Sequence, residues 1–481
     1  MRSSTVLAAA IGASGVSAFW RMPCRSRTGV ARMDPLVDPG KVADHVHAIH
    51  GGGAFSLTST PKDLAQSECT SCGVTQDKSA YWTPSLHFMY ANGSSVMVEQ
   101  VGGMLAYYLM YMDNLVPFPA DFQMVAGNRN YRNFTGPFPD APLSSWPTDP
   151  TDQYFLEQRA LGFNCLNYDK DPEPSLYRHQ FPSKSYMDAN CKDGLRMELA
   201  FPSCGNGQSD SPDHQSHVKY PSLVKEGNCP QGFDVHYPFL FFETIWATQA
   251  FAGQDGHFAF SMGDPVGAGY HGDFMMGWDS PEFLGTAMTV CGSSSGSGEV
   301  QDCPLFTLQS DSTAAQCTFN VPEELKDDDC TGMRDGLPVD VPMQWGPEPA
   351  TKYAVAGVNG VATSVNNSPS SAPTGYTASK DLSYTAADPA VTKTAQGGIV
   401  VAEVNTSTSS SSVAAPVKAQ VTQAPAVSQA ADGAHPVTTK YITQANEVIE
   451  MVIEEVDVTV TAASPSSRAY KRHAHAHGHR H

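Results

Sequence analysis

The chain has 481 residues with 29 basic and 49 acidic side chains, which gives a formal net charge of -20. Nucleic acids and anionic membranes attract proteins through a positive field, so this charge argues against both as partners. Charged residues make up only 16% of the sequence, against roughly a quarter in ordinary globular proteins, and this composition is typical of exported, glycosylated proteins.

The N-terminus has the pattern of a secretory signal peptide. Arg2 precedes an apolar stretch from Val6 to Val16, and small residues up to Ala18 come before Phe19. A membrane span needs about 20 apolar residues, and no stretch of the chain reaches that length. We therefore expect residues 1–18 to be a signal peptide and the mature protein to be secreted, with no transmembrane segment. Because the C-terminus is basic rather than apolar, no GPI anchor is expected.

Cysteines and glycosylation sequons agree with export. All 11 cysteines lie between Cys24 and Cys330, and in an oxidising compartment most should form disulfides, which leaves one unpaired. Cys69 and Cys72 have the spacing of metal ligands, but no second such pair exists, so a structural disulfide is favoured over zinc. Sequons begin at Asn92, Asn133, Asn366 and Asn405.

A change in composition near Trp345 divides the chain. Every cysteine and tryptophan lies at or before this residue, so residues 19–346 are predicted to form one globular domain. Residues 347–440 are rich in Ser, Thr, Pro and Ala and predict a disordered, stalk-like spacer. Residues 441–463 are apolar and alternate in a strand-like way, but a short isolated strand is unstable, so a fluctuating segment is favoured over a docked one. Residues 464–481 form a basic, histidine-rich terminus.

The globular part predicts a mainly β fold. Gly and Pro are dense and long helical periodicity is scarce, while short aromatic or β-branched runs recur between turn signals. Strands are expected within 81–90, 95–98, 105–112, 239–246 and 257–262. A sandwich or jelly roll with long loops and disulfides is the expected architecture. A parallel α/β fold is the alternative, which the lack of alternating helices disfavours.

Three histidine clusters mark the expected functional site. They are Asp44-His45-Val46-His47, Asp213-His214-Gln215-Ser216-His217 and His271-Gly272-Asp273-Phe274. In extended backbone, side chains two positions apart share a face, so His45 and His47 can approach one ligand together, as can His271 and Asp273. Converging clusters would suit a divalent metal such as copper or zinc, or a sugar. Otherwise each histidine caps a turn or bonds a buried carbonyl.

The residues expected to act in catalysis are His45, His47, Asp213, His214, His217, His271 and Asp273. The residues expected to hold metal are His45, His47, His214, His217 and His271, together with the terminal His473, His475, His477, His479 and His481. The terminal histidines alternate along the chain and can chelate metal without a fold. The alternative for this terminus is an expression tag or a dispensable tail.

Several motifs in one order resemble the fungal secreted family DUF1996, a domain of unknown function. They are the run Met33–His47 with Gly51-Gly52, Cys69-x-x-Cys72, Tyr81-Trp82-x-Pro84, Gly194-Leu195-Arg196, Phe201-Pro202-Ser203-Cys204, Asp213-His214-x-Ser216-His217, Gly263-Asp264 and His271-Gly272-Asp273-Phe274-x-x-Gly277-Trp278. The resemblance covers most of residues 19–300 and implies an extracellular or cell-wall protein. It departs from the family after Cys204, where a tryptophan is common and this chain has Gly205.

Three classes of function remain open. The first is a carbohydrate-active enzyme, in which the histidines act as general base or metal ligand and Asp213, Asp264 or Asp273 as acid or orienting group. The second is a non-catalytic protein that binds metal or glycan, and the third is a structural wall component. A copper oxygenase that uses an N-terminal histidine is disfavoured, because the predicted mature terminus is Phe19.

Within the enzyme class, Glu243 and Asp273 are the candidates for a pair of catalytic carboxylates. Tyr107, Tyr108 and Trp278 would stack on sugar rings if exposed, although aromatic residues in a β-rich domain are more often part of the core. The expected function is therefore a secreted fungal protein whose His/Asp site binds or modifies cell-wall polysaccharide, with a divalent metal as the candidate cofactor.

Overall fold

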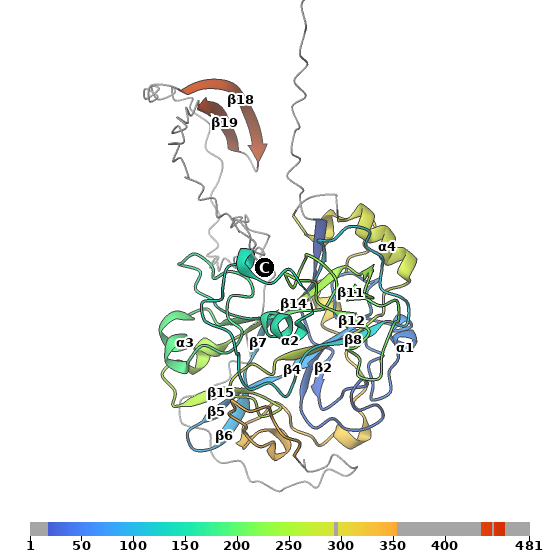
Figure 1. Cartoon of the computed structure of the whole chain (residues 1–481), viewed down its shortest axis with the longest axis vertical. Coiled ribbons are helices and arrows are strands. Elements are labelled where there is room, and N and C mark those ends of the chain that lie inside the picture. Colours follow the sequence, from blue (N-terminus) through green and yellow to red (C-terminus); the bar gives the residue numbers. More distant parts are fainter. Residues whose placement is uncertain (1–17, 150, 293–296, 354–433, 445–446, 457–481) are drawn as a thin grey trace, which may run out of the picture. The chain divides into compact units, whose positions relative to one another are not determined.

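Two five-stranded antiparallel sheets pack face to face in the computed structural model, which describes residues 18–149, 151–292, 297–353, 434–444 and 447–456 (Figure 1). Sheet I has the order β1 (Ala18–Cys24), β7 (Gln100–Met110), β14 (Phe239–Trp246), β10 (Leu195–Ala200), β9 (Leu161–Cys165). Sheet II has the order β2 (Gly29–Ala31), β3 (His47–Gly51), β4 (Ala80–Pro84), β16 (His271–Met275), β8 (Gln123–Gly127).

Smaller sheets and short helices surround these two sheets (Figure 1). One small sheet has the order β15 (Gly256–Phe260), β5 (Leu86–Tyr90), β6 (Ser94–Met97), β17 (Arg334–Asp335), and another has the order β12 (Val218–Lys219), β11 (Cys204–Gly205), β13 (Val235–His236). The α-helices are α1 (Pro61–Ala65), α2 (Gln153–Arg159), α3 (Lys184–Asn190), α4 (Pro281–Val290) and α5 (Asp311–Ala314). The 3-10 helices are η1 (Leu143–Ser145), η2 (Thr248–Phe251), η3 (Val300–Asp302), η4 (Glu323–Leu325) and η5 (Pro338–Asp340).

The alternation of side chains along the strands explains why the two sheets face each other. In β14, Leu240 and Phe242 belong to the core shared with sheet II, whereas Phe239 and Phe241 pack on the opposite face of sheet I. The ring of Phe242 meets the ring of Tyr81 from β4 edge-on, with centroids 5.5 Å apart. Burial of each such aromatic side chain stabilises the fold by about 1.5–3 kcal/mol.

The two sheets pack closely where β16 carries a glycine. A Cβ atom at Gly272 would lie 2.5 Å from the Leu199 side chain of β10, which is closer than carbon atoms can pack. The residues on either side of this glycine, His271 and Asp273, therefore point to the outer face of sheet II, because neighbouring side chains of a strand alternate between faces.

The outer face of sheet II is covered by the segment between β2 and β3, residues 32–46, which we call the cover segment. Ile49 and Trp82 point outward from sheet II and pack against Met33 and Leu36 of the cover segment. Arg32, which is only 1% exposed, donates from Nε to a carboxylate oxygen of Asp328 at 2.6 Å. The cover segment is therefore fixed both by apolar packing and by a buried ion pair.

Five disulfides link the domain, and the single free cysteine is the buried Cys330. The bridges are Cys24–Cys72, Cys69–Cys317, Cys165–Cys191, Cys204–Cys229 and Cys291–Cys303. One unpaired cysteine was predicted from the odd count, and disulfides at Cys69 and Cys72 were predicted in place of zinc. Both predictions are confirmed, although Cys69 and Cys72 join different bridges rather than each other.

The mainly β architecture with packed antiparallel sheets, long loops and disulfides confirms the predicted fold class. Gly205, at the position where the resemblance implied a tryptophan, lies against Tyr237, whose ring would be 2.4 Å from an added Cβ. A larger side chain therefore does not fit there.

In the part of the chain that the structure describes, no helix has the length and apolar character needed to cross a membrane.

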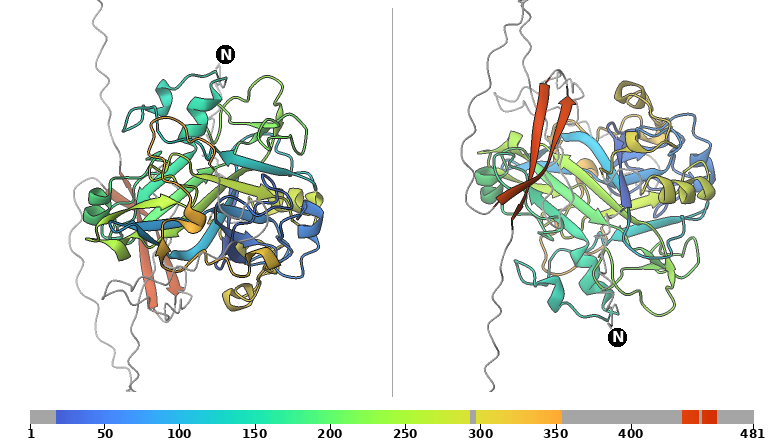
Figure 2. Two further views of the ribbon diagram at one scale, coloured as in Figure 1. Left: turned by 90° about the horizontal axis from the view of Figure 1, so that it is seen from below. Right: turned by 90° about the horizontal axis from the view of Figure 1, so that it is seen from above.

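The C-terminal part of the chain belongs to a second unit, of which residues 434–444 and 447–456 are described. Its described strands, β18 (Ala434–Gln444) and β19 (Glu447–Val456), pair in an antiparallel hairpin, drawn in red (Figure 2). They overlap the predicted strand-like segment 441–463 and begin inside the predicted stalk 347–440. Most of this stalk, the signal peptide up to residue 17 and the whole terminus 464–481 lie outside the described residues, so the domain boundaries stay predictions.

Candidate metal centre

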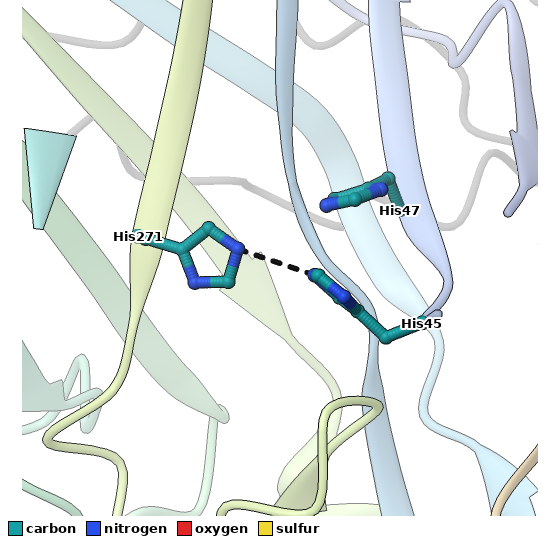
Figure 3. A group of neighbouring side chains, drawn as sticks. All are labelled: His45, His47 and His271. Carbon is teal, nitrogen blue, oxygen red and sulfur yellow. Dashed lines mark hydrogen bonds between the residues drawn. The ribbon is translucent and has the colours of Figure 1, made fainter. Parts of the chain in front are cut away.

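Three of the predicted histidines converge on the outer face of sheet II. His45 lies in the cover segment two residues before β3, His47 begins β3, and His271 begins β16. The strands β3 and β16 lie on opposite sides of β4, where His47 pairs with Pro84 and Asp273 pairs with Trp82. Figure 3 shows His271 pointing from its strand toward the two rings on the other side.

The three imidazoles lie close enough to share one ion. Their nearest ligand atoms are all within 4.8 Å of one another, and the Nε2 atoms of His45 and His271 are 3.2 Å apart. The ring centroids of His45 and His47 are separated by 4.2 Å. Two nitrogen ligands of a tetrahedral zinc ion, each at about 2.0–2.1 Å from the metal, lie roughly 3.3 Å apart, so this spacing suits a shared metal.

Hydrogen bonds to the other ring nitrogens orient two of these rings. His45 Nδ1 lies 2.7 Å from a carboxylate oxygen of Asp44, and His271 Nδ1 lies 2.9 Å from the carbonyl oxygen of Gly269. Both partners are acceptors, so each Nδ1 carries the proton and donates it, which leaves a lone pair on each Nε2. Two lone pairs then face each other, an arrangement that a proton or a cation between them stabilises.

Burial keeps the three histidines in the neutral form that binds metals. His45, His47 and His271 are 1%, 0% and 4% exposed. Burial, followed by the positive charge of Arg129, lowers the pKa of His45. Burial and the neighbouring His45 lower the pKa values of His47 and His271 well below the ordinary value. Metal ions bind the deprotonated ring nitrogen, so these shifts favour the ligand form at neutral pH.

Asp44 links the site to Arg129, which follows β8. Arg129 donates to the second carboxylate oxygen of Asp44. Burial alone would raise the pKa of Asp44, but the hydrogen bond with His45 and the charge of Arg129 lower it strongly. The carboxylate therefore stays ionised and holds the His45 ring, as carboxylates do behind metal-binding histidines.

A second group of close ligand atoms contains Asp34, His47 and Asp273. Asp273 is fully buried, and neither of its carboxylate oxygens has a hydrogen-bond partner. Burial and the nearby Asp34 raise the pKa of Asp273 well above its ordinary value, and burial raises the pKa of Asp34 to about 6. Buried polar groups normally have partners, so these unpaired oxygens indicate a place for a proton or a cation.

Asp264 acts behind His271 rather than beside it. Its carboxylate accepts hydrogen bonds from the backbone N–H groups of Val266, Gly267 and Gly269 at 2.7–3.0 Å. This network shapes the turn whose Gly269 carbonyl holds the His271 ring. Asp264 therefore fixes the backbone of this turn, and its predicted role as acid or orienting group stays a prediction.

The cluster Asp213–His217 lies apart from these groups. His214 is held by Asp210 through Nδ1 and by the carbonyl of Leu36 through Nε2, and His217 Nδ1 lies 3.0 Å from Ser211 Oγ. Asp213 accepts from the N–H groups of Gln215 and Ser216 and so closes a turn. Neither His214 nor His217 belongs to a group of close metal ligands among the described residues, and their predicted roles stay predictions.

A surface pocket of about 190 Å³ lies beside this turn. It is lined by Gly127 of β8, by Tyr154 and Glu157 of α2, and by Asp213 and Lys219, among others. Gly127 pairs with His271 in sheet II, so the strand that forms one wall of the pocket is the direct neighbour of the strand that carries the histidine.

The residues predicted to stack on sugars, and the predicted pair of catalytic carboxylates, do not form one site. Tyr107, Tyr108 and Trp278 are at most 2% exposed and belong to the core. Glu243 points to the face of sheet I away from sheet II, whereas Asp273 points to the outer face of sheet II. Both sheets lie between them, so the two carboxylates do not flank one glycosidic bond. The terminal histidines lie outside the described residues.

Sequence reasoning did not assign a site role to Asp34 or Arg129. Asp34 belongs to the first resembling motif and lies in the cover segment, but its spacing from the histidines gave no sign of the contact. Arg129 has no local motif, and only the pairing of β8 with β16 brings it beside Asp44.

Comparison with known protein families identifies the domain. A family model described as a domain of unknown function, DUF1996, matches residues 34–278. No curated protein and no solved structure matches the chain. The matched range is just over half of the chain, starts at Asp34 and includes every residue of both ligand groups. The chain therefore belongs to the DUF1996 family.

Proposed function

We propose that this chain is a secreted fungal protein whose domain binds a divalent transition metal, such as zinc or copper, and binds or modifies cell-wall polysaccharide beside it. The ligands are His45, His47 and His271. The approach of two Nε2 atoms to 3.2 Å, with both Nδ1 atoms held by acceptors, carries this proposal. Imidazole nitrogens are preferred ligands of zinc and copper, which supports this choice of metals.

Export is supported by the covalent chemistry of the domain. Ten of its cysteines form disulfides, which persist in oxidising compartments and are rare in the cytosol. The sequon residues Asn92 and Asn133 are exposed, so a glycan at either position would extend into solvent.

The polysaccharide part of the proposal is supported by the pocket at α2 and β8. Tyr154 is 47% exposed and offers a ring face for a sugar. Tyr131 donates to Glu157 at 2.7 Å, and burial raises the pKa of Glu157. A volume of about 190 Å³ is smaller than the roughly 300–1,000 Å³ of drug-sized sites, which favours a single sugar ring or chain end.

A bound metal would supply Lewis acidity or an activated water, provided that one coordination position stays open. The chain would contribute the histidine ligands, the orientation through Asp44 and the exclusion of water by the cover segment. The near-complete burial of the three rings favours a second candidate, in which the metal is held in a closed site and the domain binds polysaccharide without turnover.

Elemental analysis tests the metal. The full secreted chain, purified without nickel and with the five terminal histidines replaced by alanine, should retain zinc or copper after dialysis. The His45→Ala/His47→Ala double variant should lose it. A His50→Ala variant is the matched control, because His50 is also buried on β3 but faces sheet I. Metal-free, folded parent protein would contradict the proposal.

Binding to wall polysaccharides tests the second part. The parent chain should bind one insoluble glycan, such as chitin or β-glucan, in a saturable way, and Tyr154→Ala should weaken that binding. Tyr168→Ala is the control, since Tyr168 is 38% exposed but does not line the pocket. Soluble fragments released from the glycan would favour an enzyme, whereas binding without products would favour the non-catalytic candidate. Equal binding by all three proteins would contradict the assigned pocket.

A further inference from the structure

We propose that the site holds two cations rather than one, with the imidazole of His47 as the bridging ligand. This inference rests on the proposed metal function and adds a second position, formed by Asp34 and Asp273 together with His47. No assigned role accounts for this carboxylate pair.

The grouping of the ligand atoms supports two metal positions. Among the described residues they fall into two groups of mutual neighbours, one with His45 and His271 and the other with Asp34 and Asp273. His47 is the member that both groups share. Ligands of one ion must all lie close to one another, so this pattern indicates two positions that share His47.

The free nitrogens of the His47 ring support a bridging role. The side chain is 0% exposed, and neither Nδ1 nor Nε2 has a hydrogen-bond partner. The backbone of Met33 faces the ring without reaching hydrogen-bond geometry. His45 and His271 each use one nitrogen to bind an acceptor, whereas His47 keeps both nitrogens available. When two cations bind, the ring loses its remaining N–H proton to solvent and becomes an imidazolate.

The charge and burial of Asp34 and Asp273 also favour a second cation. Asp273 is buried with both oxygens unpaired, and Asp34 uses one oxygen to accept the N–H groups of Leu36 and Val37. Two carboxylates side by side in a dry site repel each other unless a proton or a cation lies between them. A second cation would neutralise both carboxylates and use their free oxygens, as oxygen ligands do for hard and borderline cations.

The full secreted chain with the five terminal histidines replaced by alanine tests this by metal stoichiometry. After loading with zinc and dialysis, elemental analysis should find about two zinc ions per chain. Asp34→Asn should reduce this to about one, because the asparagine oxygen still accepts the two backbone N–H groups but its charge is lost. Asp77→Asn is the control, since Asp77 is equally buried and bonded to Tyr81 and Ser79 elsewhere.

Each outcome separates the two proposals. One zinc in the parent chain would overturn the second position and leave the proposed metal function intact, whereas no zinc would overturn both. A fall to one zinc in the Asp77→Asn control would also count against the assignment of Asp34.

Copper tests the bridge itself. An imidazolate bridge couples two Cu(II) spins antiferromagnetically, so the integrated electron paramagnetic resonance signal should fall below the copper content. Asp34→Asn should restore one full spin per bound copper. A parent protein with two coppers and two full spins would overturn the bridging role of His47.

Discussion

The Nε2 atoms of His45 and His271 lie 3.2 Å apart although 226 residues separate the two histidines in the chain. The contact depends on the order of sheet II, in which β4 separates the strands that begin near these residues. Each ring is oriented by a different backbone segment, and so the pair forms only in the folded domain. A measurement of metal binding would therefore report whether the domain is folded.

Removal of one ligand should abolish tight binding. His271→Ala removes one of the two facing nitrogens, and we expect the affinity for zinc to fall by more than the about 10–100-fold typical of changes behind a ligand. Competition with a coloured chelator measures this. His50→Ala controls for loss of a buried imidazole. Similar affinities for the parent and His271→Ala would show that His271 is not a ligand.

Loss of the charge on Asp44 should weaken binding without removing a ligand. In Asp44→Asn the side-chain oxygen can still accept from His45, but the ring becomes a weaker donor to the metal, so we expect about 10–100-fold lower affinity. Asp140→Asn is a matched control, because Asp140 contacts both His179 and Arg159 away from the site. An equal decrease in both variants would point to a general loss of stability.

Metal removal should lower the thermal stability of the parent chain. A ligand present at 100 times its Kd stabilises the native state by about 2.7 kcal/mol, which in a domain of this size corresponds to roughly 4 °C in Tm. Calorimetry with and without a chelator measures the shift. The His45→Ala/His47→Ala variant should show no shift, and a chelator effect of equal size there would place the metal elsewhere.

Glu243 should make the domain less stable as pH rises. Burial raises the pKa of Glu243 from 4.5 to about 7, even though Arg196 acts in the opposite direction. Between these values the unfolded chain releases the proton and the folded chain keeps it, so the free energy of unfolding decreases from pH 4.5 to about 7, by up to roughly 3 kcal/mol.

Glu243→Gln should remove this pH dependence. Urea unfolding at pH 5 and pH 8 should show that the variant gains stability relative to the parent at the higher pH. The substitution also weakens the contact with Arg196, but this changes the free energy of unfolding equally at both pH values and cancels in the comparison. Arg196 retains its ion pair with Glu198 at 2.9 Å. A constant difference at both pH values would show that Glu243 is ionised in the folded domain.

The sequence was sufficient for the fold class because the strands carry local signals. The aromatic and β-branched run Phe239–Trp246 forms β14 with the predicted bounds. The proximity of His45 and His47 was also open to prediction, since positions two residues apart share a face in extended backbone. Which clusters meet depends on the order of the strands in the sheet, and no local sequence pattern predicts that order.

Asp34 and Arg129 show this limit most clearly. Asp34 reaches the site because the cover segment folds back over Ile49 and Trp82, and Arg129 reaches it through the pairing of β8 with β16. His214 belongs to neither ligand group among the described residues. Its cluster carries an equally strong histidine pattern, but the ring nitrogens of His214 are used by Asp210 and the Leu36 carbonyl.

The bridge between Cys69 and Cys317 connects the far end of the domain to its N-terminal part, where the segment that covers the site lies. It brings the segment that contains Asp328 back to the start of the domain, where Asp328 pairs with Arg32 of the cover segment. Since the cover segment carries Asp34, Asp44 and His45, we expect the ligand set to be complete only after this disulfide has formed. For the proposed secreted metal-binding protein, this order would place metal uptake during or after export.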